Sequence, residues 1–160
     1  MPLKRHSSLI PLSHDHRSGL FAANLIRTGA PRYQGVPTDL PGKRAYLLQF
    51  AEQELTPHLA LEEQVLFPLV EGLSDEIKTL VQALRVEHQD LRHMLTHLPP
   101  ADASDLQVAL DQLSGLLNAH IRKEERQLFE AIQAIMSEEE LLDLGETLRS
   151  AGEDLKNPPQ

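Results

Sequence analysis

Two histidine–glutamate pairs stand at the same spacing in two parts of the chain. Glu62 follows His58 by four residues, and Glu124 follows His120 by four. In an α-helix, residues four apart differ in direction by about 40° and in height by about 6 Å, so each pair projects from one helix face. An imidazole and a carboxylate on one face can hold a metal ion together. The two side chains of each pair are therefore predicted to bind the same partner.

The two pairs belong to a longer internal repeat. Residues 58–67, HLALEEQVLF, align without a gap on residues 120–129, HIRKEERQLF. An acid–histidine dipeptide also precedes each copy. These dipeptides are Asp15-His16 and Glu87-His88. The chain therefore has the pattern of two helical hairpins, each supplying two histidines and one glutamate.

That set of side chains has a chemical meaning. Two imidazoles and one carboxylate are the minimal set that holds a non-heme iron and leaves coordination positions open, so two such sets predict a dinuclear centre. The predicted metal ligands are His16, His58, Glu62, His88, His120 and Glu124. The two glutamates are the natural bridging ligands, because a carboxylate has an oxygen for each ion. Two divalent ions outweigh two carboxylates in charge, so an oxide, hydroxide or exogenous anion is also expected between them.

The other ionisable residues near these motifs fail the same test. His14 points about 200° away from His16 around a helix, and only His16 lies on an apolar stripe. His93 and His97 lie off the face of His88 and are expected to be exposed, and His6 precedes the first helix. Tyr46 fits either a core position or a place near the site.

Four acidic neighbours of the predicted ligands are most simply interpreted as solvated charge. The alternative is that some of them orient the ligand imidazoles through the outer ring N–H. These residues are Asp15, Glu63, Glu87 and Glu125.

The elements that must position the ligands are helices. Apolar residues recur at steps of three and four, and Val, Ile and Thr are too sparse for a rich sheet. Serines at 13, 74 and 104 are predicted N-caps, Ser137 with Glu140 forms a capping box, and Pro57 is a predicted kink. The expected helices run from Ser13 to about Thr28, about Lys43 to Val70, Ser74 to about Leu98, Ser104 to about Ile135, and Ser137 to about 151, closed by Gly152.

The core-facing stripes of two helices pass through the predicted ligands. The predicted stripes are Ala51, Leu55, His58, Glu62, Leu66 and Leu69 in the second helix, and Leu106, Leu110, Leu113, Leu117, His120, Glu124 and Leu128 in the fourth. Short connections between long helices predict an all-α, up-down-up-down four-helix bundle over about 12–135. A short fifth C-terminal helix at about 137–151 and a mobile tail at 153–160 complete a single domain over 1–160.

Composition excludes several classes of function. A formal net charge of −9 with no basic cluster disfavours nucleic-acid binding. The chain has no cysteine, so any metal must be held by nitrogen and oxygen. No stretch is long enough to span a membrane, and the N-terminal run broken by Pro11 is a poor signal peptide, so a cytoplasmic protein is expected.

The motifs together resemble the hemerythrin-like, or HHE cation-binding, family over about Leu12 to Phe129. The resemblance rests on the segments Leu12–His16, His58–Pro68, Glu87–Arg92 and His120–Phe129. It implies a four-helix bundle around a non-heme di-iron centre. Carried over by position, it implies the same ligands, His16, His58, Glu62, His88, His120 and Glu124.

The chain departs from the oxygen-carrying members of that family. Those members have a second histidine one turn from the first in the third helix, where this chain has Leu84 and Arg92 around His88. They also use His-x-x-x-x-Asp in the fourth helix, where this chain has His-x-x-x-Glu. The four-His, two-Glu set looks more like the di-iron proteins of the nitric-oxide and iron–sulfur repair type, without the cysteine-bearing N-terminal extension of some of them.

Three hypotheses about function follow. The first is a di-iron protein, oxo- or hydroxo-bridged, that binds O2, NO or peroxide for sensing, stress protection or iron handling. The second is a metal-dependent enzyme, peroxidase-like or ferroxidase-like. The third is a structural module in which zinc or manganese cross-links the bundle. A small molecule is the expected partner in the first two, and assembly as a homo-oligomer stays open.

Overall fold

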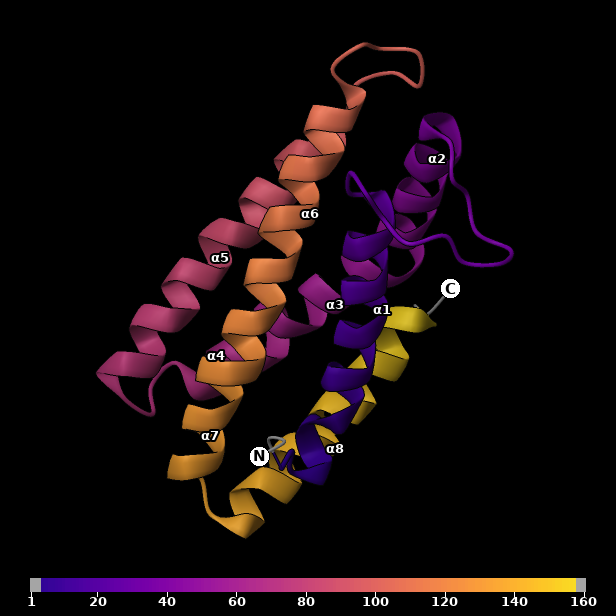
Figure 1. The fold of residues 1–160 in the computed structure, drawn as a ribbon. Helices are drawn as coiled ribbons and strands as arrows, with labels where there is room; N and C mark the ends of the chain where they lie inside the picture. Colours follow the sequence, from indigo (N-terminus) through magenta and orange to yellow (C-terminus); the bar gives the residue numbers. More distant parts are fainter. Residues whose placement is uncertain (1–3, 158–160) are drawn as a thin grey trace.

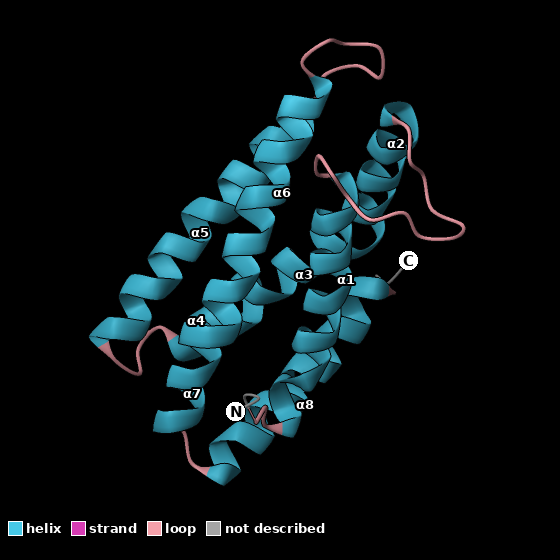
Figure 2. Ribbon diagram, viewed as in Figure 1, coloured by secondary structure: helices cyan, strands magenta, loops and turns pink. Residues whose placement is uncertain are grey.

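Helices dominate the part of the chain that the structure describes (Figure 1). The structure is a computed structural model that describes residues 4–157. None of these residues forms a β-strand (Figure 2). The predicted all-α fold is confirmed. No helix within residues 4–157 combines the length and the apolar character needed to cross a bilayer.

The N-terminal helix begins before its predicted cap. A 3₁₀ turn at Ser7–Leu9 leads into α1, Ile10–Ile26. Ser13 lies inside this helix, and its hydroxyl donates a hydrogen bond to Glu125 Oε1 at 2.7 Å. The cap prediction was wrong because Pro11 occupies the first turn of the helix, where the missing proline N–H costs nothing and its fixed φ favours helix entry.

The second long helix starts at Leu40, with Asp39 as its cap, and changes its winding along its length. Two π turns interrupt the α-helical hydrogen bonding, and each precedes a proline, Pro57 or Pro68. The axis bends between the first two α segments, as Pro57 predicted (Figure 1). In order, the segments are α2 Leu40–Phe50, the π turn Ala51–Leu55, α3 Thr56–Leu61, the π turn Glu62–Leu66, and α4 Phe67–Val70.

The third predicted helix is α5, Asp75–Thr96, and Ser74 caps it as expected by accepting a hydrogen bond from the Ile77 N–H. The fourth begins at Leu106, and its N-cap Asp105 makes no side-chain cap bond, so the predicted cap at Ser104 was wrong. Its segments are α6 Leu106–Lys123, the π turn Glu124–Leu128 and α7 Phe129–Ile135.

The fifth helix, α8 at Glu138–Lys156, opens with the predicted capping box of Ser137 and Glu140. It does not close at Gly152, and it covers the segment predicted to be a mobile tail as far as Lys156. A glycine ends a helix when it adopts a left-handed φ, and the glycines with positive φ in the described chain are Gly29 and Gly35. Residues 158–160 of the predicted tail lie outside the described residues.

The π turns shift the phase of the helix faces. Leu69, predicted to lie on the core stripe seven residues after Glu62, is 50% exposed, while Phe67 and Val70 are buried. A π turn adds a residue to one turn, so the position that returns to the core moves from 69 to 70. A π turn also begins at Glu124, so both copies of the repeat contain this change in winding.

Two apolar clusters form the core of the bundle. One contains Leu12, Leu66, Leu84 and Leu128, and helix α8 packs against it through Leu141, Leu144 and Leu148. The other contains Ala23, Leu59, Leu91 and Leu117. Along α1 and α5, and along α6 with the π turn that follows it, the predicted ligands lie between residues of the first cluster and residues of the second. A polar layer therefore separates the two halves of the core.

Candidate metal centre

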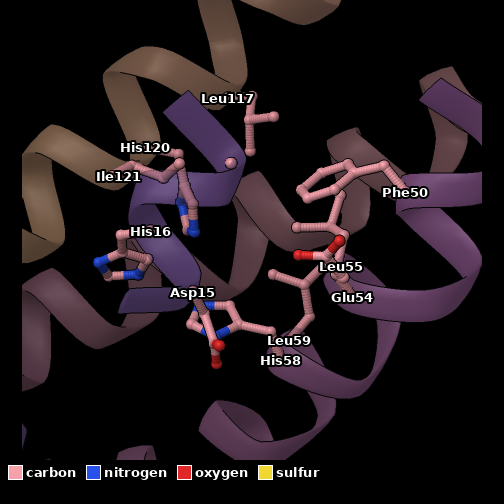
Figure 3. A pocket seen from close by; sticks show the side chains of 11 residues that line it. Asp15, His16, Phe50, Glu54, Leu55, His58, Leu59, Leu117, His120 and Ile121 are labelled. Atoms are coloured by element: carbon pink, nitrogen blue, oxygen red, sulfur yellow. The ribbon is translucent and has the colours of Figure 1, made fainter. Parts of the chain in front are cut away.

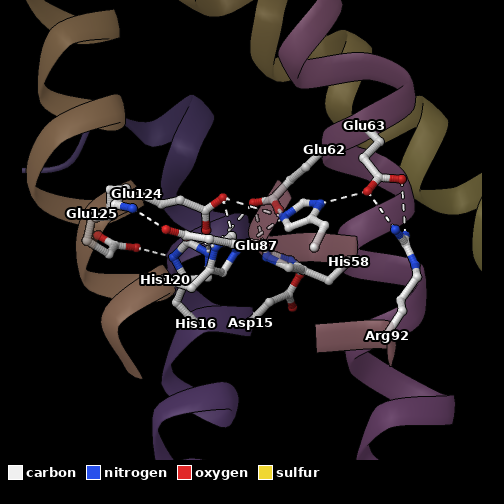
Figure 4. A network of polar contacts seen from close by, with 12 residues as sticks. Asp15, His16, His58, Glu62, Glu63, Glu87, Arg92, His120, Glu124 and Glu125 are labelled. Carbon is white, nitrogen blue, oxygen red and sulfur yellow. Dashed lines mark hydrogen bonds and ion pairs between the residues drawn. The ribbon is translucent and has the colours of Figure 1, made fainter. Parts of the chain in front are cut away.

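The structure brings all six predicted ligands together in this polar layer (Figure 4). His16 comes from α1, His88 from α5 and His120 from α6. His58 lies in α3, while each glutamate is the first residue of a π turn. All six are buried, and the largest exposed fraction among them is 7%, for His58.

The six residues form two overlapping quartets. In each quartet the candidate ligand atoms lie within 4.8 Å of one another. Glu62 and Glu124 belong to both. The first quartet adds the histidines of the first hairpin, His16 and His58, and the second adds His88 and His120. The structure thus places both carboxylates between two histidine pairs.

The two oxygens of Glu62 face different histidine pairs. Oε1 lies 3.1 Å from His58 Nε2 and 3.7 Å from His16 Nε2. Oε2 lies 3.4 Å from His88 Nε2, on the other side. One oxygen is therefore directed to each pair.

Glu124 repeats this arrangement from the opposite hairpin. Its Oε2 lies 3.0 Å from His16 Nε2, and its Oε1 lies 3.4 Å from His120 Nε2 and 4.0 Å from His88 Nε2. Two ligands bound to one ion at about 2.1 Å, at angles of 90° to 109°, are about 3.0 to 3.4 Å apart. Most of the separations fall close to that range.

Buried atoms without hydrogen-bond partners test whether a metal fits here. Both oxygens of Glu62 and of Glu124, together with the Nε2 atoms of His16 and His58, are buried and make no hydrogen bond. Some of these atoms lie within 4 Å of one another, but their angles are not those of a hydrogen bond. Leaving such groups unpaired costs several kcal/mol each. A cation is the partner that suits carboxylate oxygens and imidazole lone pairs at once, so the residues fit a two-metal site.

An outer layer of carboxylates fixes all four imidazoles (Figure 4). A carboxylate only accepts, so each Nδ1 is the donor, and each Nε2 is directed to the centre, where it offers a lone pair when the ring is neutral. The contacts are His16 Nδ1 to Glu125 at 2.6 Å, His58 Nδ1 to Asp15 at 3.1 Å, His88 Nδ1 to Glu63 at 2.8 Å and His120 Nδ1 to Glu87 at 2.8 Å. The simplest interpretation of these acids as solvated charge was wrong.

The outer carboxylates follow the internal repeat. Asp15 and Glu87, each just before a predicted ligand, accept from the other histidine of their own hairpin. Glu63 and Glu125, each just after a predicted ligand, accept from a histidine of the opposite hairpin. The hydrogen bonds therefore hold each hairpin together and also tie the two hairpins to each other. The repeated acid–histidine and Glu-Glu dipeptides are the feature of the sequence that could have predicted these hydrogen bonds.

Cations support three of the four outer carboxylates. Arg92 forms two hydrogen bonds to Glu63, Arg5 donates to Glu125 at 2.9 Å, and Lys123 pairs with Glu87. Burial opposes ionisation of Glu125, but hydrogen bonds from His16 and Ser13 outweigh it and hold its pKa at about 2.

The pKa values of two further outer carboxylates are lowered in the same way. Burial again opposes ionisation, and it is outweighed by hydrogen bonds from Arg92 and His88 at Glu63. At Glu87 the hydrogen bonds come from His120 and Lys123. Both carboxylates therefore stay charged and keep the imidazole lone pairs directed inward.

Phenylalanine rings close one side of the centre. Phe129 stacks on His16 with ring centroids 5.5 Å apart, and Phe67 packs on His88 at 5.4 Å. The two rings occupy the same place in the repeat, and each packs on a histidine of the other hairpin. Arg5 covers the outer face of Phe129. Water is thus excluded from this side of the layer.

The other side contains a small cavity (Figure 3). Its volume is about 10 Å³, enough for about one water-sized molecule. Rings of three predicted ligands border it, and apolar side chains supply most of the remaining wall. The lining includes His16, His58, His120, Gly19, Phe50 and Ile121. A small ligand in this cavity would therefore lie beside the imidazoles of the centre, against a wall that is mostly apolar.

The remaining histidines lie elsewhere. His93 and His97 are exposed, as predicted, and His14 is exposed as well. His6 accepts a hydrogen bond from the Ser8 N–H, and its Nε2 lies 3.1 Å from Glu138 at the start of α8. Tyr46 packs at the edge of the second apolar cluster and contributes no atom to either quartet.

Comparison with known proteins agrees with this geometry. The family described as Hemerythrin HHE cation binding domain matches residues 11–132, which include both hairpins and all six clustered residues. The chain belongs to this hemerythrin family. Its cluster of buried histidines and glutamates is the candidate cation site of a hemerythrin-like bundle.

One curated relative of this hemerythrin-like chain has a described role. The chain is similar to the "Iron-sulfur cluster repair protein YtfE" of Enterobacter sp. (strain 638), with 29% identity over 130 residues. The match covers 72% of this chain and 59% of the relative, so the chain spans little more than half of that protein's length. No solved structure matches the hemerythrin-like chain significantly.

Proposed function

We propose that this hemerythrin-like protein holds two iron ions between its hairpins and binds a small ligand, O2, NO or peroxide, beside them. The first ion would be held by His16 and His58, the second by His88 and His120, and both by the two glutamates. The observation that carries the proposal is the opposed direction of the two oxygens in each buried carboxylate.

The surrounding residues give each part of the site a role in this proposal. Bound irons would supply Lewis acidity and a change of oxidation state next to the small cavity. The outer carboxylates keep the Nε2 lone pairs directed inward, and the phenylalanines exclude water from one side. The cavity beside His58 and His120 has room for about one water-sized molecule, so it suits only a very small ligand. Protection against nitric oxide or peroxide, sensing, and iron handling all fit this arrangement.

The relative suggests which biological role to test first. Its name assigns it to iron–sulfur cluster repair, and the match covers 72% of this chain. We propose that iron handling linked to such repair is the first role to examine in this protein. A metal-dependent peroxidase or ferroxidase is the rival, and steady-state turnover would distinguish it from binding alone. A cytoplasmic location stays a prediction.

Metal analysis together with spectroscopy tests the proposal. Protein purified with iron should contain two equivalents and show ultraviolet and visible bands of a bridged ferric pair, which change when nitric oxide is added to the reduced protein. The matched variants are His58→Ala, which should lose iron, and His14→Ala, an exposed histidine two residues from a predicted ligand, which should not. Stable binding of zinc or manganese, without any response to nitric oxide, would instead support a structural metal.

A further inference from the structure

The four carboxylates that orient the imidazoles of the centre are not equally well fixed themselves. Glu63, Glu87 and Glu125 each pair with a cation as well as with an imidazole. Asp15 has no ion-pair partner other than His58 within residues 4–157. Its side chain is 48% exposed, whereas those of the other three carboxylates are 18–25% exposed. The contact from Asp15 to His58 is also the longest of the four, at 3.1 Å.

A large cleft reaches this weakly supported imidazole. The cleft has a volume of about 460 Å³ and lies between α8, α3 and the start of α1. Its wall on α8 includes Gly145, Leu148 and Gly152, and Pro57 and Leu61 face them from α3. Helix α8 packs directly against α3 and the 3₁₀ turn, so the helix forms the cover of the cleft.

Three residues line both the cleft and the small cavity at the centre. They are Asp15, Glu54 and His58. The two carboxylates at this junction suit the passage of a cation. The cleft wall contains two cations, Arg149 and Lys156. Arg149 is ion-paired with Glu146 and Glu153, so its charge is largely offset, and Lys156 lies in the last turn of α8, away from the junction. The cleft is therefore a route between solvent and the ion position at His16 and His58.

We infer that the two ion positions exchange at different rates, an inference that rests on the proposed function. The outer ion, held by His16 and His58, enters and leaves through the cleft beneath α8, past Asp15 and Glu54. The inner ion, held by His88 and His120, is the retained one, because both of its imidazoles are fixed by carboxylates that a cation supports. The site thus carries one deliverable ion and one resident ion.

The carboxylates that orient the imidazoles predict how much the exchange rates of the two ions differ. Removing a partner that orients a ligand imidazole typically lowers metal affinity about 10-fold to 100-fold. The outer ion has one well-supported imidazole, and the inner ion has two. Asp15 is present and lacks only the cation, so the outer ion should leave faster than the inner ion by less than the loss of a partner would cause, several-fold to about tenfold.

Iron release from the full chain tests this inference. Protein loaded anaerobically with ferrous iron is mixed with excess ferrozine, and the coloured complex is followed with time. Two phases of one equivalent each are expected. Asp15→Asn should accelerate the fast phase about tenfold and leave the slow phase unchanged. Glu87→Gln, the matched change at the other hairpin, should accelerate only the slow phase.

A second pair of variants tests the route. A Cβ placed at Gly152 would lie 3.7 Å from Leu61, an ordinary contact, so Gly152→Leu narrows the cleft without forcing the backbone. It should slow the fast phase at least several-fold. Gly115→Leu is the control, because it adds the same side chain to a helix where nothing lies within 4 Å. It should change neither phase.

Each outcome decides a different statement. Two equivalents of iron that leave in one phase, or a fast phase that responds to Glu87→Gln and not to Asp15→Asn, would overturn unequal exchange while the di-iron proposal stands. Two phases that Gly152→Leu does not alter would overturn the route. Fewer than two bound equivalents by metal analysis before mixing would overturn the di-iron proposal, and unequal exchange with it.

Discussion

The Nε2 atoms of His88 and His120 face each other at 3.2 Å in the buried centre of the bundle. Each ring already directs its Nδ1 to a carboxylate, Glu63 or Glu87, and a carboxylate can only accept. Neutral rings so oriented oppose two lone pairs, which repel. A cation between the nitrogens removes the repulsion, either as a proton or as a metal ion. The pair therefore links the stability of the bundle to what occupies its centre.

Metal removal should destabilise the protein. A ligand present at 100 times its dissociation constant stabilises the folded state by about 2.7 kcal/mol per site. For a chain of this length, 1 kcal/mol moves the melting temperature by about 2–4 °C, so each ion should add roughly 5–10 °C. Circular dichroism melting with and without a chelator measures the effect. Equal melting temperatures for the two forms would contradict the assignment of this centre to metal.

The outer carboxylates should control metal affinity. Glu125→Gln keeps the shape of the side chain but removes the charge that fixes the His16 ring. Affinity for ferrous iron should fall about 10-fold to 100-fold, measured by competition with a chelator of known affinity. Glu130→Gln is the control, because Glu130 also pairs with Arg5 but is 38% exposed and does not touch His16. An equal loss in both variants would mean that Arg5, and not the hydrogen bond to His16, sets the affinity.

The metal-free protein should lose stability as pH rises above neutrality. Burial disfavours a charged His58, but the nearby carboxylates of Glu62 and Asp15 outweigh it and raise its pKa from 6.5 to about 9. A raised pKa stabilises the fold fully below pH 6.5, and this contribution is lost as pH rises through 9. At the acid end, the lowered pKa of Glu125 stabilises the fold above pH 4.5 and is lost as pH falls toward 2.

Urea unfolding in the presence of a chelator tests this dependence. Stability should be lower at pH 9 than at pH 6, by up to about 3 kcal/mol for His58 alone. His58→Gln should remove much of the difference. Metal-loaded protein should show the opposite trend, because metal competes with protons for the imidazoles and binds more tightly at higher pH. A metal-free protein that is more stable at pH 9 would show that these histidines are neutral in the folded state.

The sequence predicts the cluster because one repeat contains most of the geometry. Two gapless copies of His-x-x-x-Glu, with the acid–histidine dipeptide that precedes each copy, are enough to place six side chains at one level of a bundle. Helix ends are less predictable, since Ser13 and Ser104 have the chemistry of caps but the helix starts elsewhere. A residue type shows that a position could form a helix cap, but the residues on both sides determine whether a helix starts there.

The π turns mark the limit of prediction from periodicity. An apolar stripe drawn with 3.6 residues per turn places Leu69 in the core, but the π turn that begins at Glu62 moves that role to Val70. The proline at 68 follows this turn as Pro57 follows the earlier one. The turn that begins at Glu124 has no such proline. Composition alone therefore does not reveal where the winding changes.

Filling the small cavity should separate ligand binding from metal binding. Gly19 lines the cavity, and a Cβ at this position would lie 2.7 Å from the Cδ1 atom of Ile121. In Gly19→Val the Ile121 side chain must shift, and the added methyl groups take the space beside the rings of His16 and His58. Forcing extra carbon atoms into a packed site costs about 1–3 kcal/mol, so affinity for nitric oxide should fall about 5-fold to 150-fold.

The same variant should keep its metal, because Gly19 contributes no ligand atom to either quartet. Metal analysis should still give two equivalents of iron, while titration of the reduced protein with nitric oxide should show the weaker binding. Gly115→Val controls for the loss of a helical glycine, since it faces open space. If Gly19→Val bound nitric oxide as tightly as the unmodified protein, the ligand would have to approach the centre from a side other than this cavity, and the cleft at Asp15 would be the next place to block.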